Sequence, residues 1–145
     1  MLAFVAAVVM ALGGPEGIPP HLLGRWTVGA PYELGQPSAL DAAHGDRIRK
    51  LRIGLSKEHI EVCGKVVPVK SVRIETLTQA QFLDRYNFPA KAIGLTGPRV
   101  TEIDMNEFAS TNACGDFADP GTHLFTSNGK VVMEVANDYF RLLKH

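Results

Sequence analysis

The chain has 145 residues, of which 46% are hydrophobic and 21% charged, and this composition suits one domain with a packed core. Fifteen Lys and Arg balance fifteen Asp and Glu, so the formal net charge at pH 7 is zero. A neutral chain lacks the positive field that a phosphate backbone requires, and nucleic acid is therefore not an expected partner. The charges are uneven, however. Residues 46–75 hold eight basic and four acidic residues, whereas residues 99–119 hold one basic and five acidic.

Residues 1–13 have the pattern of a cleavable signal peptide. The run from Leu2 to Leu12 is apolar without interruption, and Ala11 and Gly13 offer the small residues of a cleavage site. A helix over this run would be only about 16 Å long, against about 30 Å of hydrocarbon core, so we expect no membrane span after cleavage. These features predict a secreted or periplasmic protein. No Lys or Arg precedes the run, which leaves a buried N-terminal strand as the alternative.

A flexible linker is expected over residues 14–21, because Pro15, Pro19 and Pro20 remove hydrogen-bond donors and restrict the backbone. A single β-barrel-like domain is then predicted over residues 22–145.

The first half of that domain alternates apolar and polar residues with the period of β-strands. A strand is expected over Gly24–Val28, followed by a short helix that Ser38 begins and Gly45 ends. Further strands are expected over 51–62, with a tight turn at 63–66, and the returning strand is expected to run on from Val67 through Ile74.

The second half holds one clearly signalled helix. Thr78 and Gln81 form a capping-box pattern, and the helix should end near Tyr86. The remaining elements are a strand within 99–108, a loop over 109–121, and hairpins with turns at Asn128-Gly129 and Asn137-Asp138. About eight antiparallel strands and one or two short helices predict an all-β fold, either a barrel or a highly curved sheet.

The chain has two cysteines, Cys63 and Cys114. In an exported protein this even count predicts one disulfide between them. The alternative, two buried thiols, would require a cytosolic protein.

The hairpin turns predict one row of polar side chains. A two-residue turn at Asn128-Gly129 places His123 opposite Glu134, and one at Asn137-Asp138 places Glu134 opposite Arg141. Such a row could bind an anionic group or tune the histidine. More often such a row is a stabilising ladder on a solvated surface, with each pair worth about 0.2–1 kcal/mol.

Trp26 carries a resemblance to a known family. The Gly24-Arg25-Trp26 sequence at the start of the first strand resembles the entry motif of lipocalins, which are small secreted β-barrel proteins. The resemblance implies that Trp26 closes one end of a barrel and that Arg141 packs over it. Asn137-Asp138-Tyr139 is similar to a turn of that family. Trp26 could also serve only as part of the core.

The sequence contains no Gly-x-Ser-x-Gly, His-Glu-x-x-His or phosphate-binding glycine motif, so we expect no catalytic residue, metal or cofactor. The leading interpretation is a non-enzymatic binding module, such as a protein inhibitor that acts through its loops. Two alternatives remain: a lipocalin-like carrier of a small apolar ligand, and an envelope hydrolase with an unrecognised site. The partner is therefore an unidentified protein or apolar ligand, and the candidate binding residues are His123, Glu134, Arg141 and Trp26.

Overall fold

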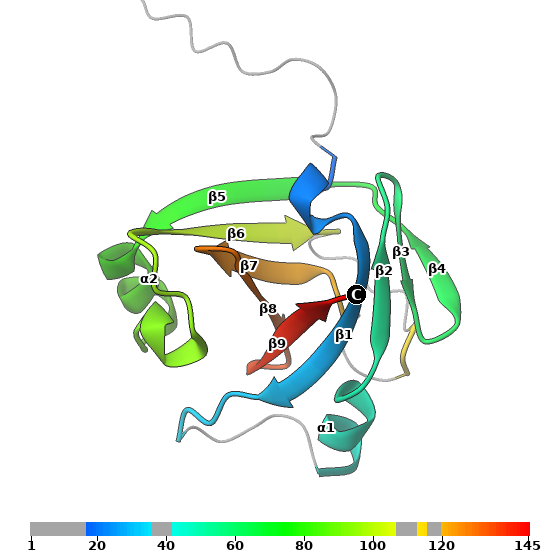
Figure 1. The fold of residues 1–145 in the computed structure, drawn as a ribbon, viewed down its shortest axis with the longest axis horizontal. Coiled ribbons are helices and arrows are strands. Elements are labelled where there is room, and N and C mark those ends of the chain that lie inside the picture. Colours follow the sequence, from blue (N-terminus) through cyan, green and yellow to red (C-terminus); the bar gives the residue numbers. More distant parts are fainter. Residues whose placement is uncertain (1–16, 36–41, 107–112, 116–119) are drawn as a thin grey trace, which may run out of the picture.

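The computed structural model describes residues 17–35, 42–106, 113–115 and 120–145. Over these residues it has nine antiparallel strands in one sheet, ordered β4-β3-β2-β1-β9-β8-β7-β6-β5, which curls into a half-barrel (Figure 1). This confirms the predicted all-β fold. The strands are β1 (Gly24–Pro31), β2 (Arg52–Leu55), β3 (His59–Val62), β4 (Lys65–Pro68), β5 (Val72–Thr78), β6 (Arg99–Met105), β7 (His123–Ser127), β8 (Lys130–Val135) and β9 (Asp138–Lys144).

The helices are short. They are α1 (Ala42–Ile48), α2 (Gln79–Tyr86) and two 3-10 helices, η1 (Pro20–Leu22) and η2 (Ala90–Ile93). The predicted capping box is present at α2, where the Gln81 amide donates to Thr78 and the Thr78 amide donates to Gln81. The expectation that Gly45 ends the first helix is wrong, because α1 continues to Ile48, which is buried in the core.

The predicted signal peptide, residues 1–13, lies outside the described residues. The predicted linker is described from Gly17 onward. In this part Ile18 is only 3% exposed and packs in the main core, and Pro20 begins η1.

The strands at the two edges of the sheet are consecutive in sequence. β4 ends at Pro68 and β5 begins at Val72, yet they lie at opposite ends of the strand order. The predicted single strand from Val67 through Ile74 is therefore wrong. Proline cannot donate to a ladder, so Pro68 suits the end of an edge strand, and the chain crosses there from one edge to the other. This short connection requires the sheet to curl.

The side chain of Asn106 stabilises that connection through hydrogen bonds. Its side-chain amide donates to the Pro68 carbonyl at 2.7 Å, and its side-chain oxygen accepts from the amides of Lys70 at 2.7 Å and Ser71 at 3.4 Å. Its own backbone amide donates to the Ser71 carbonyl at 3.0 Å. Asn106 is 7% exposed and adopts a φ of 54°, a conformation that asparagine tolerates better than most residues.

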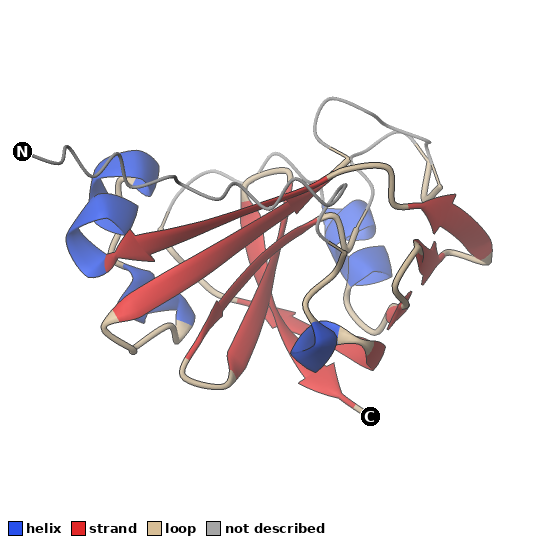
Figure 2. Cartoon of the chain, turned by 90° about the horizontal axis from the view of Figure 1, so that it is seen from above, coloured by secondary structure: helices blue, strands red, loops and turns tan. Residues whose placement is uncertain are grey.

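Each strand divides its side chains between two faces. One face is enclosed by the curl and forms the main core, with Trp26, Ile53, Ile60, Leu124, Val131, Met133, Val135, Phe140 and Leu142 among its members. On β5–β9 the other face packs against α2 and η2 through a second cluster that includes Leu77, Phe82, Phe125, Val132 and Tyr139. The helix α2 lies at one end of the curled sheet and β2–β4 at the other (Figures 1 and 2).

Three tight turns set the register of the hairpins. Asn128 and Gly129 both have positive φ, and Ser127 lies opposite Lys130, as predicted. The last hairpin turns instead at Ala136-Asn137, which also both have positive φ, so Glu134 lies opposite Tyr139. The hairpin of β3 and β4 likewise turns at Cys63-Gly64, one residue earlier than predicted.

Asn106→Ala removes three side-chain hydrogen bonds, those to the Pro68 carbonyl and to the Lys70 and Ser71 amides. We expect the free energy of unfolding to fall by about 3 kcal/mol. The matched control is Asn128→Ala, at a φ of 53° in an exposed turn, which should cost about 1 kcal/mol for the backbone conformation alone. Urea unfolding measures both, and equal losses would contradict the role given to Asn106.

Candidate functional site

The predicted pairing of His123 with Glu134 is confirmed. The two residues lie opposite each other on β7 and β8, and His123 Nδ1 is 2.8 Å from a carboxylate oxygen of Glu134. On its other side, His123 Nε2 is 2.7 Å from a carboxylate oxygen of Glu102 on β6. Both ring nitrogens are therefore engaged by carboxylates.

Arg141 does not belong to this row. The turn at Ala136-Asn137 places Arg141 opposite Val132, where its side chain is exposed. The expected row of His123, Glu134 and Arg141 is thus corrected at its third member, because the hairpin closes one residue earlier than the sequence suggested.

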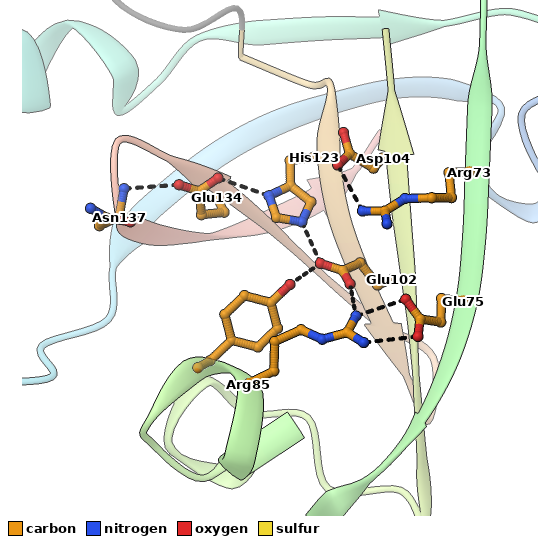
Figure 3. A network of polar contacts seen from close by, with 9 residues as sticks. Arg73, Glu75, Arg85, Glu102, Asp104, His123, Glu134 and Asn137 are labelled. Carbon is orange, nitrogen blue, oxygen red and sulfur yellow. Dashed lines mark hydrogen bonds and ion pairs between the residues drawn. The ribbon is translucent and has the colours of Figure 1, made fainter. Parts of the chain in front are cut away.

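Two residues of α2 complete the cluster. Glu102 is only 3% exposed, and its carboxylate accepts from Arg85 at 2.9 Å and from the Tyr86 hydroxyl. Arg85 also donates to both carboxylate oxygens of Glu75 on β5, at 2.7 and 2.8 Å. Figure 3 shows Glu102 between His123 and Arg85, with Glu134 on the far side of the imidazole. Glu102 accordingly ties α2 to the sheet.

The two carboxylates fix the charge of His123. Burial by itself would lower the pKa of His123, but hydrogen bonds to Glu102 and Glu134, together with their negative charges, outweigh burial and raise that pKa to about 9. Burial would also raise the pKa of Glu134, but the hydrogen bonds from His123 and from the Asn137 amide hold this pKa below its usual value. At neutral pH the cluster therefore contains an imidazolium between two carboxylates.

Such an imidazolium is poorly suited to general-base catalysis, because neither nitrogen is free to accept a proton. The geometry fits an internal ion pair that joins β6, β7 and β8 beneath α2. Glu102, Arg85 and Tyr86 were missed at the sequence level, since only tertiary packing brings β6 and α2 beside His123.

Trp26 is part of the core. It is 6% exposed, and its indole nitrogen donates to the Leu22 carbonyl at 2.8 Å. A cation does lie over its ring, as the lipocalin resemblance implied, but this cation is Lys144, with its nitrogen 5.3 Å from the ring centroid. Lys144 lies opposite Trp26 in the register of β9, so the expected Arg141 is corrected to Lys144.

Residues of β1–β4 and His145 line a groove of about 520 Å³. Figure 1 shows that β2–β4 lie at the end of the sheet away from α2. Gly54 is one of the lining residues of the groove and lies opposite Arg25 on β1 and opposite Glu61 on β3. Arg52 points to the same face two residues earlier on β2. The remaining lining residues are Ile53, Val62, Cys63, Gly64, Lys65, Val66 and His145.

The groove has an excess of positive charge. Among the side chains that line it, those of Arg25, Arg52 and Lys65 are basic and that of Glu61 is acidic. Within the described part of the chain, none of these three cations forms an ion pair. Unpaired guanidinium groups beside a recess are suited to bidentate recognition of carboxylate or phosphate groups.

The predicted disulfide is confirmed and borders this groove. Cys63 and Cys114 are bonded with their Cα atoms 5.4 Å apart, and Cys63 belongs to the groove lining. The bond attaches the turn between β3 and β4 to a segment 51 residues further along the chain. The turn at the rim is therefore held by covalent attachment as well as by its strands.

The sequence contained one hint of this groove, the excess of basic residues within 46–75, to which Arg52 and Lys65 belong. Arg25 lies outside that segment and reaches the groove only through the pairing of β1 with β2. The location of the groove was therefore not predictable from composition.

No protein-family model, curated protein or solved structure matches the chain. Across the residues that the structure describes, no helix has the length and apolar character needed to cross a membrane.

Glu102→Gln keeps the shape of the side chain but removes the charge that His123 and Arg85 share. We expect a loss of about 3 kcal/mol in the free energy of unfolding, as for other broken buried ion pairs. The control is Asp104→Asn on the same strand. Asp104 forms an ion pair with Arg73 at 3.4 Å at an exposed site, so this variant should lower the free energy of unfolding by less than about 1 kcal/mol. Similar losses for both variants in urea unfolding would refute a structural role of Glu102.

His123 should make stability depend on alkaline pH. Its pKa rises from 6.5 to about 9 on folding, so its contribution is complete below pH 6.5 and is lost as the pH rises through 9. The predicted loss is on the order of 3 kcal/mol. Unfolding curves across this range should show the decline in the wild type but not in His123→Gln. NMR titration of the His123 ring should give the raised pKa directly, and an ordinary value near 6.5 would show that the two contacts do not form in solution.

Proposed function

We propose that this protein is a non-enzymatic, exported binding domain that holds a protein partner in the basic groove of β1–β4. The observation that carries the proposal is the juxtaposition of Arg25 and Arg52 around Gly54, without an ion-pair partner for either among the described residues. Side chains with an unsatisfied binding capacity at a recess are typical of recognition sites, because a ligand gains charge-assisted hydrogen bonds there.

The charged cluster beneath α2 supports binding over catalysis. The two ring nitrogens of His123 are held by Glu102 and Glu134 at 2.7 and 2.8 Å. Both ring nitrogens already have carboxylate partners within the fold, so this geometry gives no support to a hydrolase centred on His123.

The enclosed face of the sheet supports an external binding surface over internal carriage. Large side chains such as Phe140, Met133 and Ile53 are each at most 1% exposed and fill the space inside the curl. The lipocalin-like carrier of a small apolar ligand is therefore less well supported than a surface that binds a protein. The Cys63–Cys114 disulfide supports export, since such bonds persist in oxidising compartments.

Gly54→Leu should obstruct the groove beside the two arginines while leaving all its charges in place. A Cβ at Gly54 would meet Glu61 at 3.4 Å, an ordinary contact, so the variant should fold. Peptides selected from a random phage-displayed library on the wild-type protein should bind this variant about tenfold or more weakly, as measured by fluorescence anisotropy.

The matched control is Gly45→Leu on α1, where an added Cβ meets nothing within 4 Å. It should retain wild-type binding, and thermal unfolding should verify that both variants are folded. Selected peptides that bind the wild type and folded Gly54→Leu equally well would overturn the groove as the binding surface.

A further inference from the structure

The groove also specifies the chemistry of its partner. We infer that the groove binds an extended peptide segment with carboxylate side chains at two alternate positions, such as Glu-x-Glu. This inference rests on the function proposed above. Three features of the groove carry this inference: the spacing of its arginines, the recess beside them, and its rim.

The spacing of the two arginines selects alternate positions. Arg25 lies directly opposite Gly54, and Arg52 lies two residues before Gly54 on the same face, so Arg25 and Arg52 are diagonal neighbours on adjacent strands. Diagonal neighbours in a sheet are about 7–8 Å apart. In an extended peptide, residues i and i+2 point the same way and lie about 6.6 Å apart. One carboxylate can therefore meet each guanidinium without bending the peptide.

Gly54, which neighbours both arginines, allows the peptide to approach. Gly54 is the one position in the row of Arg25, Gly54, Glu61 and Val66 that has no side chain. The nearest side-chain atoms to an added Cβ at Gly54 belong to Glu61, at 3.4 Å. A recess over backbone suits a main chain that runs across the strands, because the two flanking side chains can then reach down to the arginines.

The rim limits what else can bind. Glu61 repels a further negative charge in its part of the groove, whereas Lys65, which also lines the groove, adds a positive charge. Val66 is 60% exposed and offers an apolar contact beyond the charges. A small inorganic anion could use the arginines but not Val66, whereas a peptide can use both.

Three synthetic nonapeptides test this inference. They share a Gly-Ser background and a fluorescent label and differ only in their centres, which are Glu-Val-Glu, Val-Glu-Glu and Gln-Val-Gln. Adjacent glutamates point to opposite sides of an extended chain, so the second peptide has the same charge with the wrong spacing. At low ionic strength, Glu-Val-Glu should bind about tenfold more tightly than either of the others.

Arg25→Gln and Arg52→Gln should each lower the affinity for the Glu-Val-Glu peptide about tenfold, because each removes one charge-assisted pair. Arg99→Gln, at an exposed arginine of β6 outside the groove, is the matched control and should leave its affinity unchanged.

The outcomes separate the inference from the proposed function. If Val-Glu-Glu binds as tightly as Glu-Val-Glu and both are lost on Gly54→Leu, the groove is a binding surface but the spacing argument is wrong. If phage-selected peptides depend on Gly54 but none of the three defined peptides binds, the carboxylate pair is wrong and the proposed function stands. If Glu-Val-Glu binds equally to the wild type, Gly54→Leu and Arg25→Gln, both are overturned.

Discussion

Asn106 lies where the two edges of the sheet come together, and the shape of the protein depends on that meeting. Only residues 69–71 separate β4 from β5, although these strands are the first and last of a nine-stranded order. The Asn106 side chain binds the backbone on both sides of this connection. A sheet whose edges are tied so closely must curl, and curling encloses one face of every strand. The enclosed face fills with apolar side chains, so polar chemistry is left to the outer face.

The outer face carries two charged features with different roles. Beneath α2, the charges of Glu102, His123, Arg85 and Glu75 satisfy one another, and Glu102 is almost fully buried. Breaking such a cluster is costly, which is typical of a structural element. Over β1–β4, Arg25 and Arg52 lie beside a recess without such partners among the described residues. Satisfied charges stabilise a fold, and unsatisfied ones are available to a partner.

Local sequence signals were sufficient for the elements whose geometry they encode directly. Asn128-Gly129 fixed the hairpin of β7 and β8, and with it the opposition of His123 and Glu134. Thr78 and Gln81 predicted the start of α2, and the two cysteines predicted their bond. The register of the last hairpin was not predictable in the same way. Ala136 adopts a φ of 51° there, a conformation unusual for alanine, so the turn that displaced Arg141 had no clear sequence signal.

The pairing of strands that are distant in sequence was the other feature that the sequence did not predict. Nothing in the run from Val67 to Ile74 reveals that the chain changes edges, except Pro68 as a strand end. The position of Glu102 beside His123 and that of Arg25 beside Arg52 both follow from strand order. Alternation of apolar and polar residues predicts which face a residue occupies, but not its neighbours on other strands. The buried cluster and the groove therefore emerged only with the fold.

The proposed function requires that the groove of β1–β4, and not the His123 cluster, contacts the partner. Amide chemical shifts of the labelled protein, followed during titration with a phage-selected peptide, test this most directly because they report on both surfaces at once. We expect the shift changes to concentrate at Arg25, Arg52, Gly54 and the turn at Cys63-Gly64, with little change at His123 or Glu134. Shifts concentrated around His123, Glu134 and α2, with the groove unaffected, would contradict it.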